Sequence, residues 1–292
     1  MSSKVVIQVS PNPLGRFGHQ FHNIILGLLM SELFGIPCLK PSFTGNAEHW
    51  NSLIDWKGPL IIENFGQNPP ATYFEGYKEK FVTKTSLLDY YNLIQKSSTS
   101  NLYIVLRLME DQFAGPLIKL LPRIVGTIYS SLSFKDSLTI RQRVAIHIRR
   151  GDVSKTYASS LFTSFDSYLQ ALLLISGTLP DHWPFAIYSE GNDSDFTNFA
   201  ETLESHFHRK VELNISAQNF TLDSRGDFLE MIASSALICS YSTYASCALY
   251  FTSDYGNRFF IADERSCTPE GQNDLTVFRK IGVKIISMCS TF

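Results

Sequence analysis

The sequence predicts an α/β protein with parallel sheets, and three observations lead to this fold class. Short apolar runs alternate with amphipathic stretches of helical length along the whole chain, as in parallel sheets covered by helices on both faces. Most of the short runs are nearly continuously apolar, which is typical of strands buried on both faces. The chain has 292 residues and is 44% hydrophobic, so it is large enough for two domains of about 150 residues.

The expected strands are the short runs that combine apolar and β-branched residues. In chain order they are residues 5–9, 103–107, 144–149, 185–189, 210–215, 237–240, 258–261 and 283–287. The expected helices lie between them, at residues 18–34, 116–130, 165–175, 195–207, 227–235 and 243–251. Asp195 and Asp227 stand at the positions of N-cap residues.

The two halves of the chain differ in rhythm. Strands and helices follow each other closely from residue 144 to residue 261, whereas the first half contains longer irregular stretches, notably 43–70. We therefore expect a boundary near residue 135, with one domain of residues 1–135 and another of residues 136–292.

Composition excludes several classes of protein. The 25 basic and 27 acidic residues give a net charge of -2, which argues against a nucleic-acid partner. No signal peptide is recognisable, and the longest apolar stretch, residues 23–30, is far shorter than the roughly 20 residues that cross a bilayer. The cysteines lack metal-type pairs, and Cys38, Cys239 and Cys247 lie in apolar surroundings. We expect a soluble, cytoplasmic protein without a membrane anchor; its oligomeric state is not predicted.

The segment of residues 144–152 carries the clearest functional signal. An apolar strand ends in Arg149, Arg150, a glycine and Asp152, and ligands of open α/β sheets bind beyond the carboxyl ends of strands. The planar fork of arginine forms paired bonds with phosphate oxygens. The alternative is a surface pair of arginines, but His147 shares a strand face with Arg149, a face that a buried sheet covers. This favours a phosphate ligand.

Two strand-to-helix turns are further candidates. Arg16, Gly18 and His19 belong to a glycine-rich turn after the first strand, where backbone amides near a helix N-terminus can approach a ligand. Ser242 and Thr243 open a helix after a buried strand, and their hydroxyls can contribute to a phosphate pocket. A plain N-cap at Ser242 is the simpler alternative.

Glu190 is a candidate nucleotide contact because it ends an expected strand. An acid in this position can accept hydrogen bonds from ribose hydroxyls or guanine amines. Asp193 and Asp195 follow closely in an Asp-x-Asp pattern, which could hold a divalent cation against a diphosphate. Helix capping explains this pair equally well.

In this order, the segments resemble the fucosyltransferase superfamily, which comprises the α1,2-, α1,6- and protein O-fucosyltransferases. His-Ile-Arg-Arg-Gly-Asp at residues 147–152 is most similar to the α1,2 branch, and Gly-Arg-Phe-Gly-His-Gln at residues 15–20 is similar to a turn of the α1,2 and protein O-fucosyltransferase branches. The matches span residues 15–245, and four motifs in the family's order are harder to produce by chance than one.

The resemblance implies a GT-B-like enzyme with two Rossmann-like domains facing a cleft. Residues 1–135 would form the acceptor-side domain, and residues 136–292 the domain that binds the nucleotide-sugar donor. The implied donor-binding residues are Arg16, Gly18, His147, Arg149, Arg150, Glu190, Asp227, Ser242 and Thr243. The reaction would be an inverting transfer, most simply of fucose from GDP-fucose to a glycan acceptor. The arginines would replace a metal, so no metal or other cofactor is expected.

The implied catalytic residues are His19, Asp152 and Arg150. His19 stands where the family has asparagine, and unlike asparagine it can deprotonate an acceptor hydroxyl. Asp152 is the rival base, and a purely structural His19 is also open. His22, one turn further along, is expected to be structural.

Two other functions are compatible with the same motifs. One is transfer of another sugar, such as xylose or rhamnose, from a UDP or GDP donor. The other is a noncatalytic module that binds nucleotide sugars or glycans. Several aromatic residues of the first half can stack on acceptor sugars or pack in the core: Trp50, Trp56, Tyr73, Phe74 and Tyr77.

Overall fold

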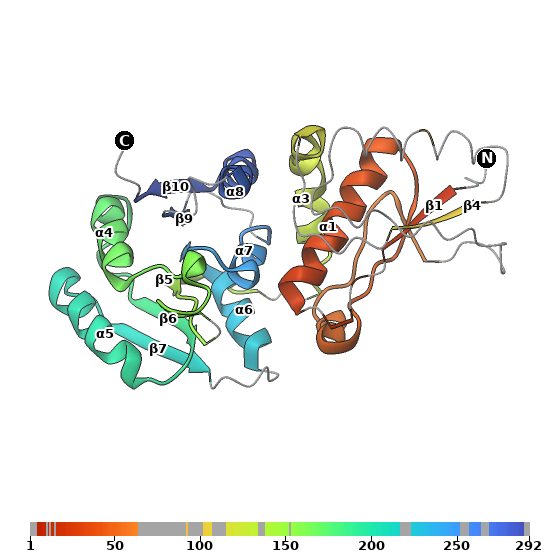
Figure 1. Ribbon diagram of the computed structural model, residues 1–292. Coiled ribbons are helices and arrows are strands. Elements are labelled where there is room, and N and C mark those ends of the chain that lie inside the picture. Colours follow the sequence, from red (N-terminus) through yellow and green to blue (C-terminus); the bar gives the residue numbers. More distant parts are fainter. Residues whose placement is uncertain are drawn as a thin grey trace. The chain divides into compact units, whose positions relative to one another are not determined.

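The computed structural model divides the chain into two compact units, Met1–Lys135 and Asp136–Phe292. It describes residues 5–9, 11, 13–14, 16–63, 92, 102–106, 115–133, 138–151, 153–216, 223–251, 257–263 and 269–288 (Figure 1). Each unit contains a parallel sheet and helices, so the α/β expectation is confirmed, and both sheets are compatible with a Rossmann-like fold. The roles expected for the two halves remain predictions.

The first unit contains a four-stranded parallel sheet of order β3-β2-β1-β4. Its strands are β1 (Val5–Val9), β2 (Cys38–Leu39), β3 (Ile61–Ile62) and β4 (Leu102–Leu106). β1 and β4 lie where strands were expected. β2 and β3 were missed because two residues are too few to show an alternating pattern.

The helices of the first unit are α1 (Phe17–Phe34), η1 (Gly45–Ser52), η2 (Gly115–Leu120) and α3 (Leu121–Ser130). Gly35 ends α1 in a left-handed conformation with a φ of 62°, a backbone geometry that glycine adopts without strain. The single helix expected over residues 116–130 is instead a 3-10 turn followed by α3. Pro122 stands in the first turn of α3, where its missing N–H costs nothing.

Aromatic side chains fill the core of the first unit. Trp50 and Trp56 are 2% and 1% exposed, and the ring of Phe17 stacks on Trp50 with centroids 3.8 Å apart. Both tryptophans therefore pack in the core, and their rings are not exposed for stacking on an acceptor sugar. Tyr73, Phe74 and Tyr77 lie outside the described residues.

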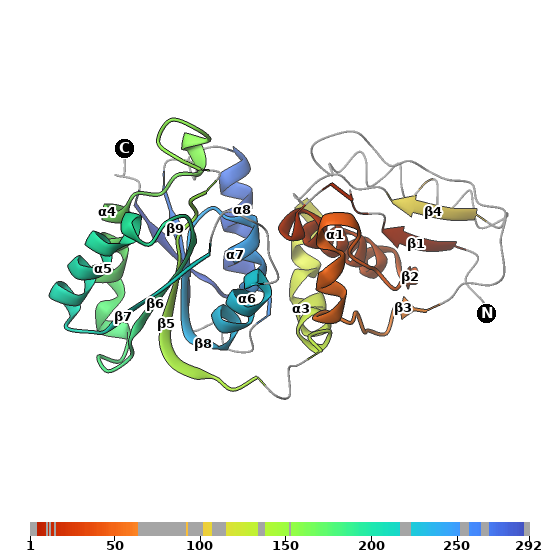
Figure 2. The same ribbon diagram turned by 90° about the horizontal axis from the view of Figure 1, so that it is seen from below.

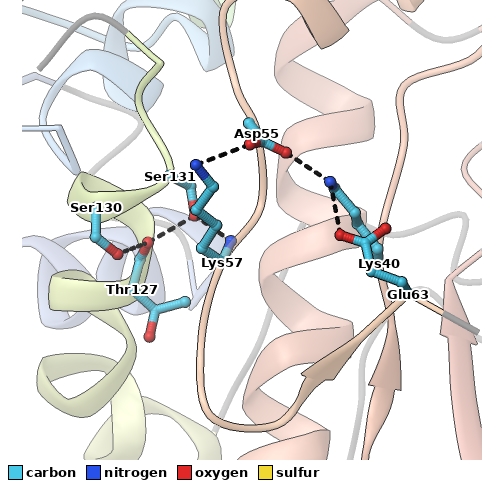
Figure 3. Close-up of polar contacts among 7 residues, drawn as sticks. All are labelled: Lys40, Asp55, Lys57, Glu63, Thr127, Ser130 and Ser131. Carbon is cyan, nitrogen blue, oxygen red and sulfur yellow. Dashed lines mark hydrogen bonds and ion pairs between the residues drawn. The ribbon is translucent and has the colours of Figure 1, made fainter.

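A chain of ion pairs joins the carboxyl ends of β2 and β3 to the segment between them (Figure 3). Lys40 Nζ lies 2.6 Å from Asp55 Oδ1 and 3.0 Å from Glu63 Oε1, and Lys57 Nζ lies 2.9 Å from Asp55 Oδ2. Hydrogen bonds from the two lysines lower the pKa of Asp55. The Asp55 amide donates to the carbonyl oxygen of Ser131, which follows α3. Asp55 and its ion pairs therefore connect the ends of β2 and β3 to the end of α3.

The second unit contains a six-stranded parallel sheet of order β10-β9-β8-β5-β6-β7. Its strands are β5 (Arg141–His147), β6 (Phe185–Glu190), β7 (Val211–Ser216), β8 (Ser234–Cys239), β9 (Arg258–Ala262) and β10 (Lys284–Ser287). All six lie at or near expected strands. β5 has β8 on one side and β6 on the other, so its carboxyl end is flanked by the ends of two neighbouring strands.

Helices cover both faces of this sheet. Figure 2 shows α4 and α5 on one face and α6, α7 and α8 on the other. The elements are α4 (Phe165–Ile175), α5 (Ser194–Phe207), α6 (Asp223–Ala233), α7 (Thr243–Ala248), α8 (Pro269–Lys280) and the 3-10 turns η4 (Ser159–Leu161) and η5 (Ser176–Thr178). The face under α4 and α5 is apolar and includes Val144, Ile146 and Ile148 of the chain around β5.

Two expected helix starts are wrong. α5 begins one residue earlier than expected, so Asp193 is its N-cap and Asp195 lies in the first turn. α6 begins at Asp223, so Asp227 lies within the helix and is not its N-cap. Asp227 therefore lies in the second turn of α6 and is half-buried. α8 was not expected at all, although Leu275, Phe278 and Ile281 follow a helical spacing.

Candidate functional site

Strand alternation separates two kinds of residue along β5. Val144 and Ile146 face the apolar core under α4 and α5, so Arg143, Ala145 and His147 face the side of α6 and α7. His147 is only 8% exposed. His147 therefore lies, as the sequence indicated, on a face of the sheet that is covered by other parts of the protein.

A polar row crosses three neighbouring strands on this face. His147 of β5 pairs in register with Tyr188 of β6, and Tyr188 pairs with Asn214 of β7. Register partners point to the same face of a sheet. Three of their atoms, His147 Nδ1, Tyr188 OH and Asn214 Nδ2, are buried and have no hydrogen-bond partner among the described residues. We call these three residues the polar row.

An unsatisfied buried polar group costs about 1–3 kcal/mol, and native proteins retain few of them. Three such atoms in one row, near the carboxyl ends of adjacent strands, form a set of hydrogen-bonding positions. A ligand that reached the polar row would have to supply both donors and acceptors.

Two carboxylates border the polar row. Burial raises the pKa of Tyr244 well above its ordinary value, and the negative charges of Asp227 and Glu190 raise it further. The Tyr244 ring also lies 5.7 Å from the His147 ring, measured between centroids. Of the residues expected at the donor site, His147 thus lies beside Tyr244, and Glu190 and Asp227 act on Tyr244 electrostatically.

His147 is neutral in the folded protein. Burial, together with the smaller effect of the positive charge of Arg149, lowers the pKa of its imidazole from 6.5 to about 3. Arg149 itself is half-buried. A neutral imidazole offers one donor and one acceptor, so His147 can bind an uncharged heterocycle beside the cation.

Arg150 is held differently from Arg149. Its Nη1 donates to the carbonyl oxygen of Arg149 at 2.7 Å, and its Nη2 donates to that of Thr163 at 3.0 Å. Its Cζ lies 4.3 Å from the centroid of the Phe162 ring and 4.8 Å from that of Phe165. Burial lowers the pKa of this guanidinium. The two arginines of the motif therefore have different surroundings.

Gly151 links the arginines to Glu190. Its φ is 75°, in the left-handed region, and a Cβ built on it would lie 2.5 Å from Glu190 Oε2. Only glycine allows this turn and this close approach without strain. The next candidate, Asp152, lies outside the described residues.

Ser242 is the N-cap of α7, and its side-chain oxygen accepts from the Ala245 amide at 3.4 Å. It is 7% exposed, whereas Thr243 is half-buried. The plain capping role is therefore present at Ser242. Asp193 and Asp195 are both exposed at the start of α5.

The candidates of the N-terminal turn belong to the first unit. Arg16 is the N-cap of α1 and makes no side-chain capping bond. Arg16 and His19 are exposed, whereas Gly18 and His22 are buried. The turn is fixed one residue further on, since Gln20 exchanges two hydrogen bonds, of 2.8 and 2.9 Å, with the backbone of Thr44.

Sequence reasoning missed Tyr188, Asn214 and Tyr244. The signal for the first two was available: both alternate with apolar residues on nearly continuous apolar strands, the same pattern that identified His147. Only the strand register shows that Tyr188 and Asn214 lie in one row with His147.

No protein-family model and no curated protein matches the chain. Across the described residues, no helix is long and apolar enough to cross a membrane. In the same part of the chain, no three His, Cys, Asp or Glu side chains are grouped as metal ligands would be. Cys38, Cys239 and Cys247 are buried, and burial raises the pKa of Cys38 and Cys239 to about 12.

Proposed function

We propose that the protein is an inverting glycosyltransferase that needs no metal and transfers fucose from GDP-fucose to a hydroxyl of a glycan acceptor. The observation that carries the proposal is the polar row beside Arg149, at the carboxyl end of a central parallel strand. In this proposal the second unit binds the donor and the first unit the acceptor.

A guanine base would meet the chemistry of the polar row. Guanine has ring and exocyclic N–H donors as well as carbonyl and ring-nitrogen acceptors, and His147 Nδ1, Tyr188 OH and Asn214 Nδ2 are buried groups that require such partners. The carboxylates of Glu190 and Asp227 can accept from the amines of guanine or from ribose hydroxyls. Burial of the base would offset the cost of the unsatisfied groups.

Arg149 would bind the diphosphate. Its guanidinium already acts electrostatically on His147, and an arginine fork forms charge-assisted bonds with phosphate oxygens. The hydroxyl of Thr243, which is half-buried at the start of α7, is a further candidate donor. Fixed positive charge of this kind stabilises the negative charge that develops on a departing diphosphate.

In the reaction, the oxygen of an acceptor hydroxyl would form a bond to the anomeric carbon. The bond from that carbon to the diphosphate would break, with its electron pair leaving on the phosphate oxygen. The hydroxyl proton would pass to a base, for which His19 and Asp152 are the candidates. Attack from the face opposite the leaving group inverts the configuration.

The test is release of GDP from GDP-fucose, with and without an acceptor mixture, by the full chain in EDTA. Changing Arg149 to Lys should lower the rate at least about a hundredfold, because one preorganised donor to the developing charge is lost. Arg279→Lys, an exposed site on α8, is the matched control and should leave the rate unchanged.

A rate for Arg149→Lys within about twofold of that of the unchanged protein would overturn the role of Arg149, because lysine cannot form the paired bonds of the arginine fork. Activity lost in EDTA and restored by manganese would instead assign Asp193 and Asp195 to a metal. Binding of GDP-fucose without any hydrolysis or transfer would favour a noncatalytic module. Turnover of a UDP sugar alone would favour the transferase of another sugar.

A further inference from the structure

The surroundings of Arg150 indicate a task other than phosphate binding. Two of its N–H groups are used by backbone carbonyl oxygens, those of Arg149 and Thr163. Its guanidinium also lies against the rings of Phe162 and Phe165, an arrangement in which the planar cation gains from aromatic contact. All of these contacts lie at the two ends of one loop.

This loop, residues 151–164, connects β5 to α4 and is called here the β5–α4 loop. Figure 2 shows it beyond one end of the sheet, in bright green. Residues 154–160 are all exposed, Tyr157 to 71%, and Ala158 has a φ of 50°, uncommon for a residue with a side chain. Local bonds within the loop join Ser154 to Tyr157 at 2.8 and 3.0 Å. The exposed arc contains little apolar surface that could fix it.

The far end of the loop is tied to other elements. Thr163 Oγ1 donates to Asp263 Oδ2, just after β9, at 2.7 Å. The Phe165 ring stacks on Phe199 of α5 with centroids 4.7 Å apart, and Ser164 caps α4. Arg150 therefore joins the end of β5 to an anchored segment and closes the loop at its base.

We propose that Arg150 is a positioning residue that holds the base of the β5–α4 loop closed and thereby fixes the peptide of Arg149 and the approach of Gly151 to Glu190. Arg149, not Arg150, then binds the diphosphate. The part that concerns Arg149 rests on the proposed function. The part that concerns the loop does not, because it follows from contacts within the protein.

The first test needs no ligand: hydrogen–deuterium exchange of the full chain, comparing Arg150→Lys, Arg150→Met and Lys155→Met. Both Arg150 variants should speed amide exchange in residues 153–164 by about tenfold or more, because neither replacement has the planar fork that spans the loop base. Lys155→Met removes the same charge from an exposed position in the same loop and should leave exchange unchanged. Phe162→Leu should reproduce the Arg150 effect without removing any charge.

The second test measures GDP affinity against salt concentration. Loss of a positioning residue should weaken GDP about tenfold with an unchanged salt dependence, whereas loss of a phosphate contact flattens the salt dependence because that attraction is what ions screen. Arg149→Met should flatten it. Exchange in the loop that is unchanged in both Arg150 variants would overturn the proposal, and so would a flattened salt dependence in Arg150→Met. If the unchanged protein binds no GDP, the proposed function fails, and the exchange result alone decides the role of Arg150.

Discussion

At the scale of single residues, the polar row makes a prediction that separates stability from binding. Changing Tyr188 to Phe removes a buried hydroxyl that has no partner among the described residues. The free energy of unfolding should stay equal or rise by up to about 1 kcal/mol, because a desolvated group is deleted. GDP affinity should fall, by about threefold or more, since a good ligand hydrogen bond contributes about 0.5–1.5 kcal/mol.

Tyr168→Phe is the matched control for this prediction, measured by urea unfolding and calorimetric titration. Tyr168 OH is also buried, but it donates to the carbonyl oxygen of His147 at 2.8 Å and is bonded to Ser240 Oγ at 2.7 Å. Its loss should destabilise the protein by about 1–3 kcal/mol, because two internal partners are left unsatisfied. Equal destabilisation by both substitutions would mean that Tyr188 has an internal role, contrary to the ligand assignment.

His147 predicts how stability depends on pH. The pKa of His147 is lowered to about 3 from 6.5, so between those values the unfolded chain takes up a proton that the folded protein does not. Because of His147, the free energy of unfolding is highest above about pH 6.5 and falls as the pH falls towards 3. The decrease is up to about 1.4 kcal/mol per pH unit. Urea unfolding from about pH 7 to pH 4 measures it.

His147→Gln should reduce the slope of the free energy of unfolding against pH by an amount equivalent to about one bound proton. His182→Gln, at an exposed position, should not. An imidazole signal of His147 that titrates near pH 6.5 in the NMR spectrum would contradict the neutral, buried state.

At the scale of elements, α1 packs closely on β1 at Gly27. A Cβ on Gly27 would lie 2.1 Å from Val9 Cγ2, whereas a Cβ on Gly126 of α3 would meet nothing within 4 Å. Alanine favours a helix over glycine by about 1 kcal/mol, but overpacking costs about 1–3 kcal/mol. Gly27→Ala should therefore lower the free energy of unfolding by about 1 kcal/mol, while Gly126→Ala should raise it by up to about 1 kcal/mol.

Thermal and urea unfolding of the two variants, and of Gly27→Ala combined with Val9→Ala, test this packing. The double variant should recover part of the loss, because the clashing Val9 methyl group is removed. Equal stabilisation by Gly27→Ala and Gly126→Ala would show that the helix and strand do not approach this closely.

Regular elements could be predicted where the sequence repeats a pattern for long enough. The range expected for α4, residues 165–175, was correct at both ends, because its apolar spacing is clear and Ser164 caps it. The patterns failed at β2 and β3, which have two residues each, and at Leu121, where α3 begins after a 3-10 turn. Such short elements are set by neighbouring strands and not by local pattern.

At the scale of the whole molecule, the sequence located part of the candidate site. His147 was predicted because it shares a strand face with Arg149 and by the resemblance, and Glu190 because it ends an expected strand. Tyr188 and Asn214 were missed, because only the register of β5, β6 and β7 aligns them with His147. Arg149 and Arg150 looked equivalent in sequence, and only the contacts of Phe162 and Thr163 distinguish them.

The proposed function assigns the polar row, two carboxylates and Arg149 of the second unit to a guanine nucleotide. A ligand that binds only the folded protein raises its melting temperature, with about 2.7 kcal/mol of stabilisation at a concentration 100 times its Kd. The response of the full chain to different nucleotides thus reports both binding and choice of base.

The most direct test is a thermal-shift comparison of the full chain with GDP, UDP, CDP and the corresponding sugar nucleotides, each with and without EDTA. We expect GDP and GDP-fucose to raise the melting temperature selectively, EDTA to leave this shift unchanged, and Arg149→Met to make it smaller. A selective response to UDP would contradict the guanine assignment. No response to any nucleotide at about millimolar concentration, where even weak specific sites fill, would contradict the central claim that this protein binds a nucleotide-sugar donor.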